Sequence, residues 1–291
     1  MKKKIFKIGL FADGVWSHSL IKLIKFNKDT ELSFICKRFR TNDKIIEKLA
    51  KKFKIPLFKL KNVNSNYSFK KIKKFNCDMF LSMSYDQIFN NRIISHPSKK
   101  IINCHAGHLP KYRGRNVLNW AIINGEKNFY ITVHYVNRDI DTGPILLRKK
   151  FKISKKDTYY SILKKAEKNC PILIFKVMKK VLEGKKIRKI YQSKSSMSAK
   201  YYFKRVAGDE IINFKTKSIK IFNFVRALSH PKLYATFLTR NKKYKIKSSQ
   251  IITKRLDKIE IKSLPGTILK SNKSFFDVRS QDNKIRLFLN R

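Results

Sequence analysis

The first hundred residues alternate short apolar runs with amphipathic segments, and this alternation constrains the fold more than any other feature. Apolar runs at 4–11, 31–39, 55–60, 77–85 and 101–105 are typical of strands. The first of them are separated by segments whose apolar residues recur at helical spacing. Strands that alternate with helices form a parallel sheet joined by crossover helices. The sequence therefore predicts an α/β fold with a Rossmann-like, mostly parallel sheet.

The middle of the chain predicts three further elements. These are a helix at 117–124, an antiparallel pair of strands at 130–136 and 145–153, and a long amphipathic helix after Ser154. Pro171 should bend or break the long helix, because proline lacks an N–H and clashes with the preceding turn. The polar, serine-rich stretch 185–200 then predicts a linker.

Residues 201–291 have a different pattern of apolar residues, with short alternating stretches. One helix is expected near 219–228, followed by the short stretches KIEIKSL, GTILK, FFDVRS and KIRLFL, which are expected as strands. This pattern predicts a small β-rich accessory domain. We therefore expect a main domain at residues 1–190 and a C-terminal domain at 201–291.

The chain is strongly basic, with 69 Lys and Arg against 19 Asp and Glu and a net charge of +50. Of the basic residues 54 are Lys, whereas bidentate phosphate and base readout favours Arg. The lysines are also spread along the whole chain. We interpret them as a solvated surface shaped by A/T-biased coding, with real affinity for polyanions as the alternative.

Targeting and metal signals are weak. No run of about 18 apolar residues occurs, so no transmembrane helix is expected, and the start of the chain is typical of a strand and not of a signal peptide. The four cysteines are widely spaced, which favours a reducing, cytoplasmic compartment. The six histidines lack metal-ligand spacing, so no metal site is expected.

Chemistry-bearing residues concentrate between 103 and 143. Asn103 and His105 are two apart on a predicted strand, so both side chains face one side at its carboxyl end. An Asn amide can donate to an oxyanion, and a His can take up and release protons near neutral pH. Asp141 follows another strand in a turn and can orient the imidazole or accept a proton. These groups suit acyl transfer to an amine.

The run NCHAGHLPKYRGRNVLNW, with DIDTGPIL further on, resembles the catalytic region of the 10-formyltetrahydrofolate-dependent formyltransferases. ADGVWSH at 12–18 and the RGRNVLNW stretch are most similar to the nucleotide-sugar N-formyltransferases. The resemblance implies a catalytic domain at 1–190. It also implies that Asn103, His105 and Asp141 move a formyl group from 10-formyltetrahydrofolate to a nucleotide-linked amino sugar, such as a dTDP-linked 4-amino-4,6-dideoxyhexose.

The resemblance implies further site residues. FLSMSYDQIF at 80–89 is similar to the strand and loop that hold the folate. The folate is expected against Met83, Ser84, Tyr85, Asp139 and Ile140. The sugar nucleotide is expected against Trp16, Arg113 and Arg115, for which core packing (Trp16) or an ordinary surface cation (the arginines) are the alternatives.

The chain departs from the family's pattern at four positions outside the catalytic three, namely Val15, His108, Tyr130 and Pro144.

Two other functions stay open. Methionyl-tRNA formyltransferase would account for the two-domain length and the basic surface. A nucleic-acid-binding protein without catalysis would bind RNA in a salt-dependent way. A homodimer, common in the family, is also compatible with the sequence.

Overall fold

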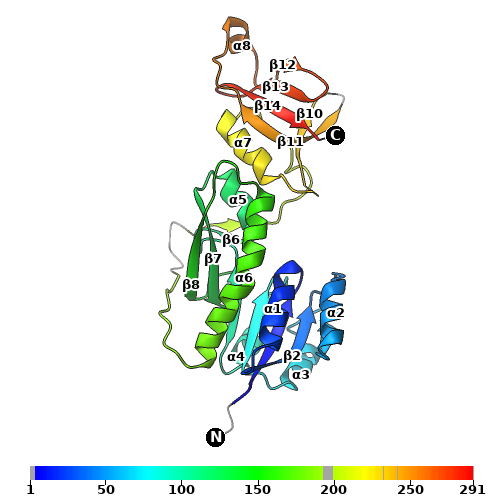
Figure 1. Cartoon of the computed structure of the whole chain (residues 1–291), viewed down its shortest axis with the longest axis vertical. Coiled ribbons are helices and arrows are strands. Elements are labelled where there is room, and N and C mark those ends of the chain that lie inside the picture. Colours follow the sequence, from blue (N-terminus) through cyan, green and yellow to red (C-terminus); the bar gives the residue numbers. More distant parts are fainter. Residues whose placement is uncertain (1–3, 193–198, 232, 241, 291) are drawn as a thin grey trace. The chain divides into compact units, whose positions relative to one another are not determined.

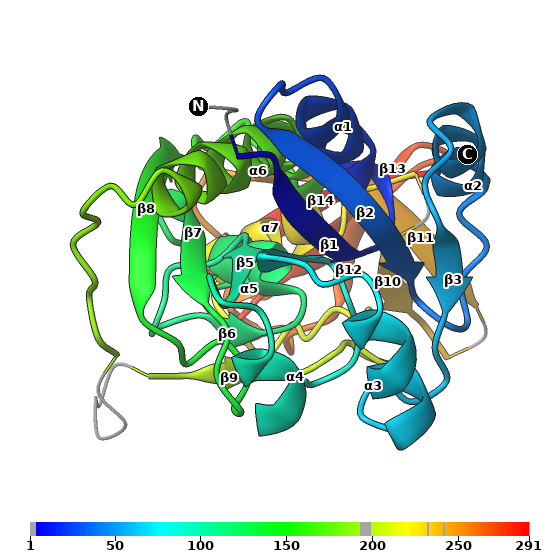
Figure 2. The same ribbon diagram turned by 90° about the horizontal axis from the view of Figure 1, so that it is seen from below.

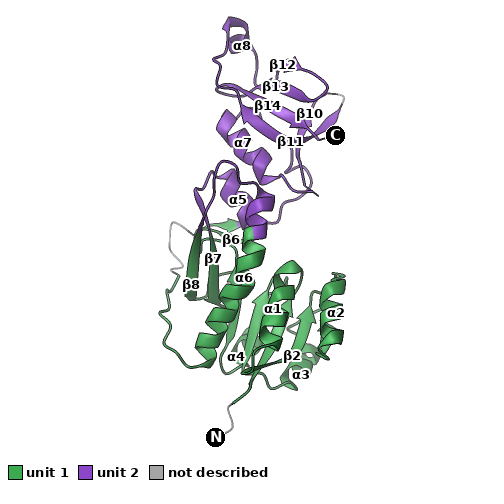
Figure 3. Ribbon diagram, in the orientation of Figure 1, with its two compact units in different colours: residues 1–114, 130–150, 165–201 green, residues 115–129, 151–164, 202–291 purple. Residues whose placement is uncertain are grey.

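The computed structural model describes residues 4–192, 199–231, 233–240 and 242–290. Within these ranges the chain folds into two compact units that interleave in sequence (Figure 3). Unit 1 comprises residues 1–114, 130–150 and 165–201, and unit 2 comprises 115–129, 151–164 and 202–291. The domain boundary expected between 190 and 201 stays a prediction.

Unit 1 is built on a seven-stranded sheet. Its strands, in spatial order, are β3 (Leu57–Lys59), β2 (Thr30–Lys37), β1 (Phe6–Ala12), β4 (Met79–Met83), β5 (Ile101–His105), β7 (Asn128–Tyr135) and β8 (Ile145–Lys152). Strand β7 begins in unit 2, and strand β8 ends in it. The first five strands are parallel, and β7 runs antiparallel to β5. The mostly parallel, Rossmann-like sheet is thereby confirmed.

Helices cover both faces of this sheet (Figures 1 and 2). One face carries α1 (Val15–Lys25), α2 (Lys44–Lys52) and the unit 1 part of α6 (Tyr159–Leu182), and the other carries α3 (Asn66–Lys73) and α4 (Asn91–Ser95). This two-sided cover explains why the central strands are apolar on both sides.

An aromatic cluster forms the core beneath α3 and α4. Phe11 lies at its centre, with ring centroids 5.5 Å from Phe34, 5.4 Å from Phe80 and 4.9 Å from Phe89. All four rings are buried, and such edge-to-face pairs add to the free energy of burying each ring. The core thus fixes β1, β2 and β4, whose carboxyl ends lie on the side of the sheet where open α/β folds bind ligands.

Unit 2 contains a five-stranded sheet in the order β10 (Ala235–Leu238), β11 (Lys243–Ile251), β14 (Lys284–Leu289), β13 (Phe275–Arg279) and β12 (Ile268–Ser271). Each strand is antiparallel to its neighbour. The sheet packs against α7 (Ser218–Ala227), and α5 (Val117–Ile123) belongs to the same unit. The β-rich C-terminal domain predicted from the sequence is confirmed.

One local prediction is wrong. The stretch KIEIKSL forms the helix α8 (Lys258–Lys262) and not a strand, because Asp257 and Glu260 make a capping box. Gly14 takes the N-cap position of α1 at φ 73°, and the Ser17 hydroxyl donates to the Gly14 carbonyl oxygen from inside the helix. The helix α6 is not broken at Pro171, because its buried apolar stripe offsets the cost of an interior proline.

The stretch 185–200, predicted as a linker, has backbone hydrogen bonds to the folded chain at both of its described ends. Residues 193–198 lie outside the described residues, but Ile190 on their N-terminal side exchanges two backbone hydrogen bonds with Ile145. On their C-terminal side, β9 (Tyr201–Tyr202) pairs with β6 (Arg113–Gly114). The described ends of this stretch are therefore part of the folded structure.

None of the helices in the described parts of the chain is long and apolar enough to cross a lipid bilayer.

Gly9→Ala should destabilise unit 1. A Cβ at Gly9 would lie 2.4 Å from Cζ of Phe34 and 2.7 Å from Cδ1 of Phe80, so the aromatic core must shift. We expect the free energy of unfolding to fall by about 1–3 kcal/mol, as for other overpacked cores. Urea unfolding followed by circular dichroism measures the change.

Gly184→Asn is the matched control, because nothing lies within 4 Å of the added Cβ and Asn tolerates the left-handed φ of 69°. Equal unfolding midpoints for the two variants would contradict the packing argument.

Candidate active site

The register between β5 and β7 brings four polar side chains to one face of the sheet. Asn103 lies opposite His134, and His105 lies opposite Thr132. Because side chains alternate along a strand, all four project to the same side. The predicted pair Asn103 and His105 is therefore joined by a second histidine that the sequence analysis did not select.

His105 is buried, and both of its ring nitrogens face oxygen acceptors. Nε2 lies 2.6 Å from the carbonyl oxygen of Tyr112, and Nδ1 lies 3.4 Å from Oδ2 of Asp141. A ring in this position can release or take up a proton at one nitrogen while the other stays hydrogen-bonded.

Gly107 makes room for the His105 ring. A Cβ at Gly107 would lie 2.3 Å from Nε2 of His105 and 2.6 Å from the Tyr112 carbonyl oxygen. Any larger residue would displace the imidazole from its hydrogen bond. The glycine of the NCHAG run is thus required by close packing against the catalytic candidate.

His134 orients the Asn103 amide. Its Nδ1 lies 2.7 Å from the carbonyl oxygen of Tyr135 and must donate to it, because a carbonyl oxygen only accepts. In the neutral ring Nε2 is then an acceptor, and it lies 3.1 Å from Nδ2 of Asn103. One amide N–H is thereby held, and the other has no partner among the described residues.

Asp141 joins the two histidines. Its Oδ2 accepts a hydrogen bond from the Gly114 N–H at 2.9 Å, and its Oδ1 lies 3.4 Å from Nε2 of His134. Burial alone raises the pKa of this carboxyl group, but the charge of His105 when its ring is protonated and the Gly114 N–H together hold its pKa well below the ordinary value. Asp141 therefore stays ionised at neutral pH.

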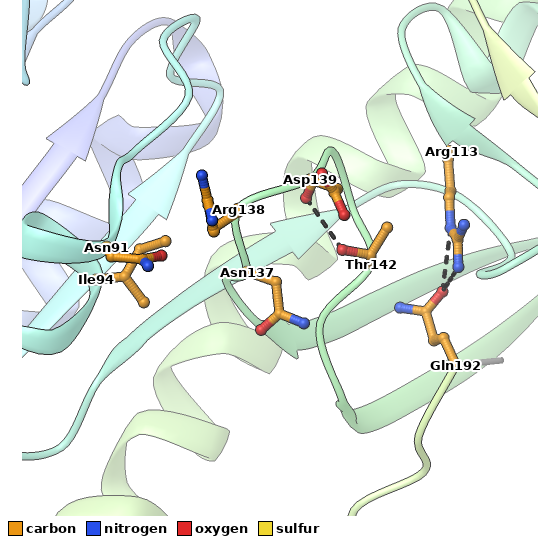
Figure 4. A pocket seen from close by; sticks show the side chains of 8 residues that line it. All are labelled: Asn91, Ile94, Arg113, Asn137, Arg138, Asp139, Thr142 and Gln192. Carbon is orange, nitrogen blue, oxygen red and sulfur yellow. Dashed lines mark hydrogen bonds between the residues drawn. The ribbon is translucent and has the colours of Figure 1, made fainter. Parts of the chain in front are cut away.

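A pocket of about 320 Å³ lies beside the Asp141 turn (Figure 4). Its walls come from α4, from the segment between β7 and β8, from β6 and from the stretch after Ile190. The lining residues are Asn91, Ile94, Arg113, Asn137, Arg138, Asp139, Thr142 and Gln192. The lining is mostly amide, hydroxyl and guanidinium groups, which suits a polar ligand with anionic parts.

The residues expected to hold the folate lie at two places in unit 1. Asp139 lines the pocket, and Ile140 beside it is exposed. Met83 is fully buried at the end of β4, and Ser84 follows with a left-handed φ of 56°. The Tyr85 ring packs on Phe11 and Phe89, so its side chain belongs mainly to the aromatic core.

The residues expected to bind the sugar nucleotide have different surroundings. Arg113 is buried and lines the pocket, where Nη1 donates to the Tyr201 hydroxyl at 3.1 Å. Trp16 is half-buried near the start of α1, and Arg115 is exposed in unit 2. The structure therefore brings only Arg113 of these three to the pocket.

Two departures from the sequence pattern contact each other. The rings of His108 and Tyr130 stack with centroids 4.0 Å apart and an interplanar angle of 20°. Tyr130 lies on β7 two residues from Thr132, so it shares the face that carries His134. The two unusual residues thus form one stacked pair.

Among the described residues, no group of three or more His, Cys, Asp and Glu is arranged to hold a metal ion. The cluster can instead donate hydrogen bonds and move protons.

Comparison with known proteins gives two family matches. Residues 35–178 match the model described as "Formyl transferase", and residues 204–289 match "Formyl transferase, C-terminal domain".

Two curated relatives and one solved structure extend the comparison. The chain is 34% identical over 227 residues to the bifunctional polymyxin resistance protein ArnA of Wigglesworthia glossinidia brevipalpis, across 78% of this chain but only 33% of ArnA. It is 29% identical over 245 residues to methionyl-tRNA formyltransferase of Thermodesulfovibrio yellowstonii, across 84% of this chain and 75% of that protein.

The solved structure is the N-formyltransferase from Helicobacter canadensis in complex with folinic acid and dTDP-3-aminofucose. It superposes with a TM-score of 0.75 at 18% identity, covering 98% of this chain and 100% of that one. At this level of identity the likeness establishes the fold alone.

Asp141→Asn should reduce stability in a pH-dependent way. Because the folded-state pKa of Asp141 is lowered, its contribution is complete above the unfolded pKa of about 4 and is lost as the pH falls through the folded pKa. Hydrogen bonds to charged groups contribute about 1.5–3 kcal/mol, so we expect a loss of that order at pH 7.

Urea unfolding of the wild type and the variant at pH 7, 5, 4 and 3.5 measures this difference, which should shrink below about pH 4. A difference that grows as the pH falls would contradict the assignment.

Proposed function

Because this chain belongs to the formyl transferase family, we propose that it transfers a formyl group from 10-formyltetrahydrofolate to the amino group of a nucleotide-linked amino sugar. The observation that carries this proposal is the cluster of Asn103, His105, His134 and Asp141 at the carboxyl end of β5, beside a polar pocket. As acceptor we propose a dTDP-linked 4-amino-4,6-dideoxyhexose. The Helicobacter canadensis enzyme, crystallised with a 3-amino sugar nucleotide, supports the class of acceptor.

The pocket fits the formyl donor. Its size falls near the lower end of the usual range for small-molecule sites, and its amides and Arg138 complement a polar heterocycle with a carboxylate tail. In this assignment Asp139 and Ile140 lie along the donor, with Met83, Ser84 and Tyr85 at the end of β4. The bound donor supplies the electrophilic formyl carbon.

Each residue of the cluster has a role in the proposed reaction. The neutral sugar amine attacks the formyl carbon, and the bond from that carbon to the carrier nitrogen breaks. The free N–H of Asn103 donates to the developing oxyanion, and His134 holds the amide in that orientation. His105 carries the proton from the attacking amine to the leaving nitrogen. Asp141 keeps the imidazole in place and balances its charge.

The product would be an N-formyl sugar nucleotide for glycan or lipopolysaccharide synthesis in the cytoplasm. The four cysteines are buried and free, which is consistent with a reducing compartment. The sugar-binding assignments of Trp16, Arg113 and Arg115 remain proposals from the sequence, and Arg113 lines the pocket assigned to the donor.

Methionyl-tRNA formyltransferase is the second candidate, and the 29% identity over 84% of this chain favours it. The net charge of +50 would also suit a tRNA backbone.

A direct comparison of acceptors tests the proposed function. The protein is incubated with 10-formyltetrahydrofolate and nucleotide-linked 3- and 4-amino sugars, or with charged initiator tRNA. Mass spectrometry should show the mass gain of a formamide on a dTDP-linked 4-amino sugar. Formylation of the tRNA alone would overturn the proposal, and formylation of a 3-amino sugar alone would overturn the position of the amine.

Asn103→Ala and His105→Ala should lose most turnover while the protein stays folded. Removal of one oxyanion donor typically costs about 10²–10³-fold in rate, and removal of a general acid–base about 10²–10⁴-fold. Steady-state kinetics with the accepted sugar measures the loss. Asn169→Ala, a partly exposed amide on α6, is the control and should keep full activity. Normal rates in either active-site variant would refute the assigned roles.

A further inference from the structure

The side chain of Gln192 spans the turn that carries Asp141. Its Nε2 donates to the carbonyl oxygen of Asp141 at 3.0 Å and to that of Gly143 at 2.7 Å. Its Oε1 accepts from Nη2 of Arg113 at 3.0 Å. Both amide hydrogens and the amide oxygen are therefore used, which leaves the amide a single orientation.

Arg113 holds the oxygen end of this amide firmly. The guanidinium is buried and also donates to the Tyr201 hydroxyl, and the Arg113 N–H donates to the Lys200 carbonyl oxygen at 2.9 Å. The next residue, Gly114, donates its N–H to the Asp141 carboxylate. Strand β6 thus holds Asp141 twice, directly through Gly114 and indirectly through Gln192.

The Asp141 turn needs such a restraint. Asp141 has a left-handed φ of 55°, a conformation that residues other than glycine adopt only uncommonly. Gly143 lies so close to Tyr135 that a Cβ would come within 1.7 Å of the Tyr135 carbonyl oxygen. Gln192 binds the carbonyl groups of Asp141 and Gly143, so its amide joins the two ends of this closely packed turn.

We propose that Gln192 is a positioning residue for catalysis, which fixes the Asp141 carboxylate against His105 and His134. The inference rests on the proposed function, because it assigns the turn a role in formyl transfer. Gln192 has no hydrogen bond to either imidazole among the described residues, so it acts through Asp141. A displacement of about 1 Å in a catalytic group can cost 10²-fold in rate.

Two variants of Gln192 separate its donors from its acceptor. Gln192→Ala removes all of its hydrogen bonds, whereas Gln192→Glu keeps an acceptor for Arg113 and removes both donors to the turn. We expect kcat to fall by about 10–100-fold in both, with KM for donor and acceptor changed by less than about threefold.

Asn283→Ala is the matched control. Asn283 is also half-buried, and its side-chain amide donates to the Ile252 carbonyl oxygen at 3.0 Å within unit 2. It should keep kcat within about twofold of the wild type. An equal loss in Asn283→Ala and Gln192→Ala, or a wild-type kcat in Gln192→Glu, would overturn the inference.

A spectroscopic measurement on the free protein needs no substrate. Long-range ¹H–¹⁵N spectra resolve the imidazole nitrogens. Gln192→Ala should shift those of His105 and His134 and leave those of His18 and His230 in place. Unchanged His105 and His134 signals would overturn the inference. If the wild type formylates no sugar nucleotide, the proposed function fails, and these spectra still decide whether Gln192 positions Asp141.

Discussion

The rest of the candidate site depends on the contacts of the Asp141 carboxylate, whose side chain is only 12% exposed. It faces His105 on β5 and His134 on β7 and is held by the Gly114 N–H on β6. A buried carboxylate is costly unless it is paired and hydrogen-bonded. The nearby His105 ring and the Gly114 N–H satisfy this requirement.

Close backbone packing makes this geometry possible. Gly107 lets the His105 ring lie against the Tyr112 carbonyl, and Gly143 lets the Asp141 turn pass the Tyr135 carbonyl. Larger side chains at either position would move a group of the site by more than a hydrogen bond tolerates. Gln192 then restrains the turn from the side of the pocket. The proposed chemistry therefore relies on residues that never touch the reacting atoms.

Local sequence signals predicted the fold where they agreed with tertiary packing. The strand at 101–105 lies where the apolar pattern placed it. The alternation in KIEIKSL suggested a strand, but local capping by Asp257 and Glu260 decided for a helix whose isoleucines are exposed. Pro171 suggested a bend or a break, and burial of the α6 stripe kept the helix unbroken.

The sequence by itself determined the α/β class and the shared face of Asn103 and His105, because strand periodicity depends only on neighbouring residues. Through its family resemblance it also selected Asp141. Only the tertiary structure decided that His134 lies opposite Asn103, because the register of β5 against β7 joins residues 31 apart in the chain. It alone placed Gln192 at the Asp141 turn, 51 residues away, since a polar stretch carries no periodic signal of its partners.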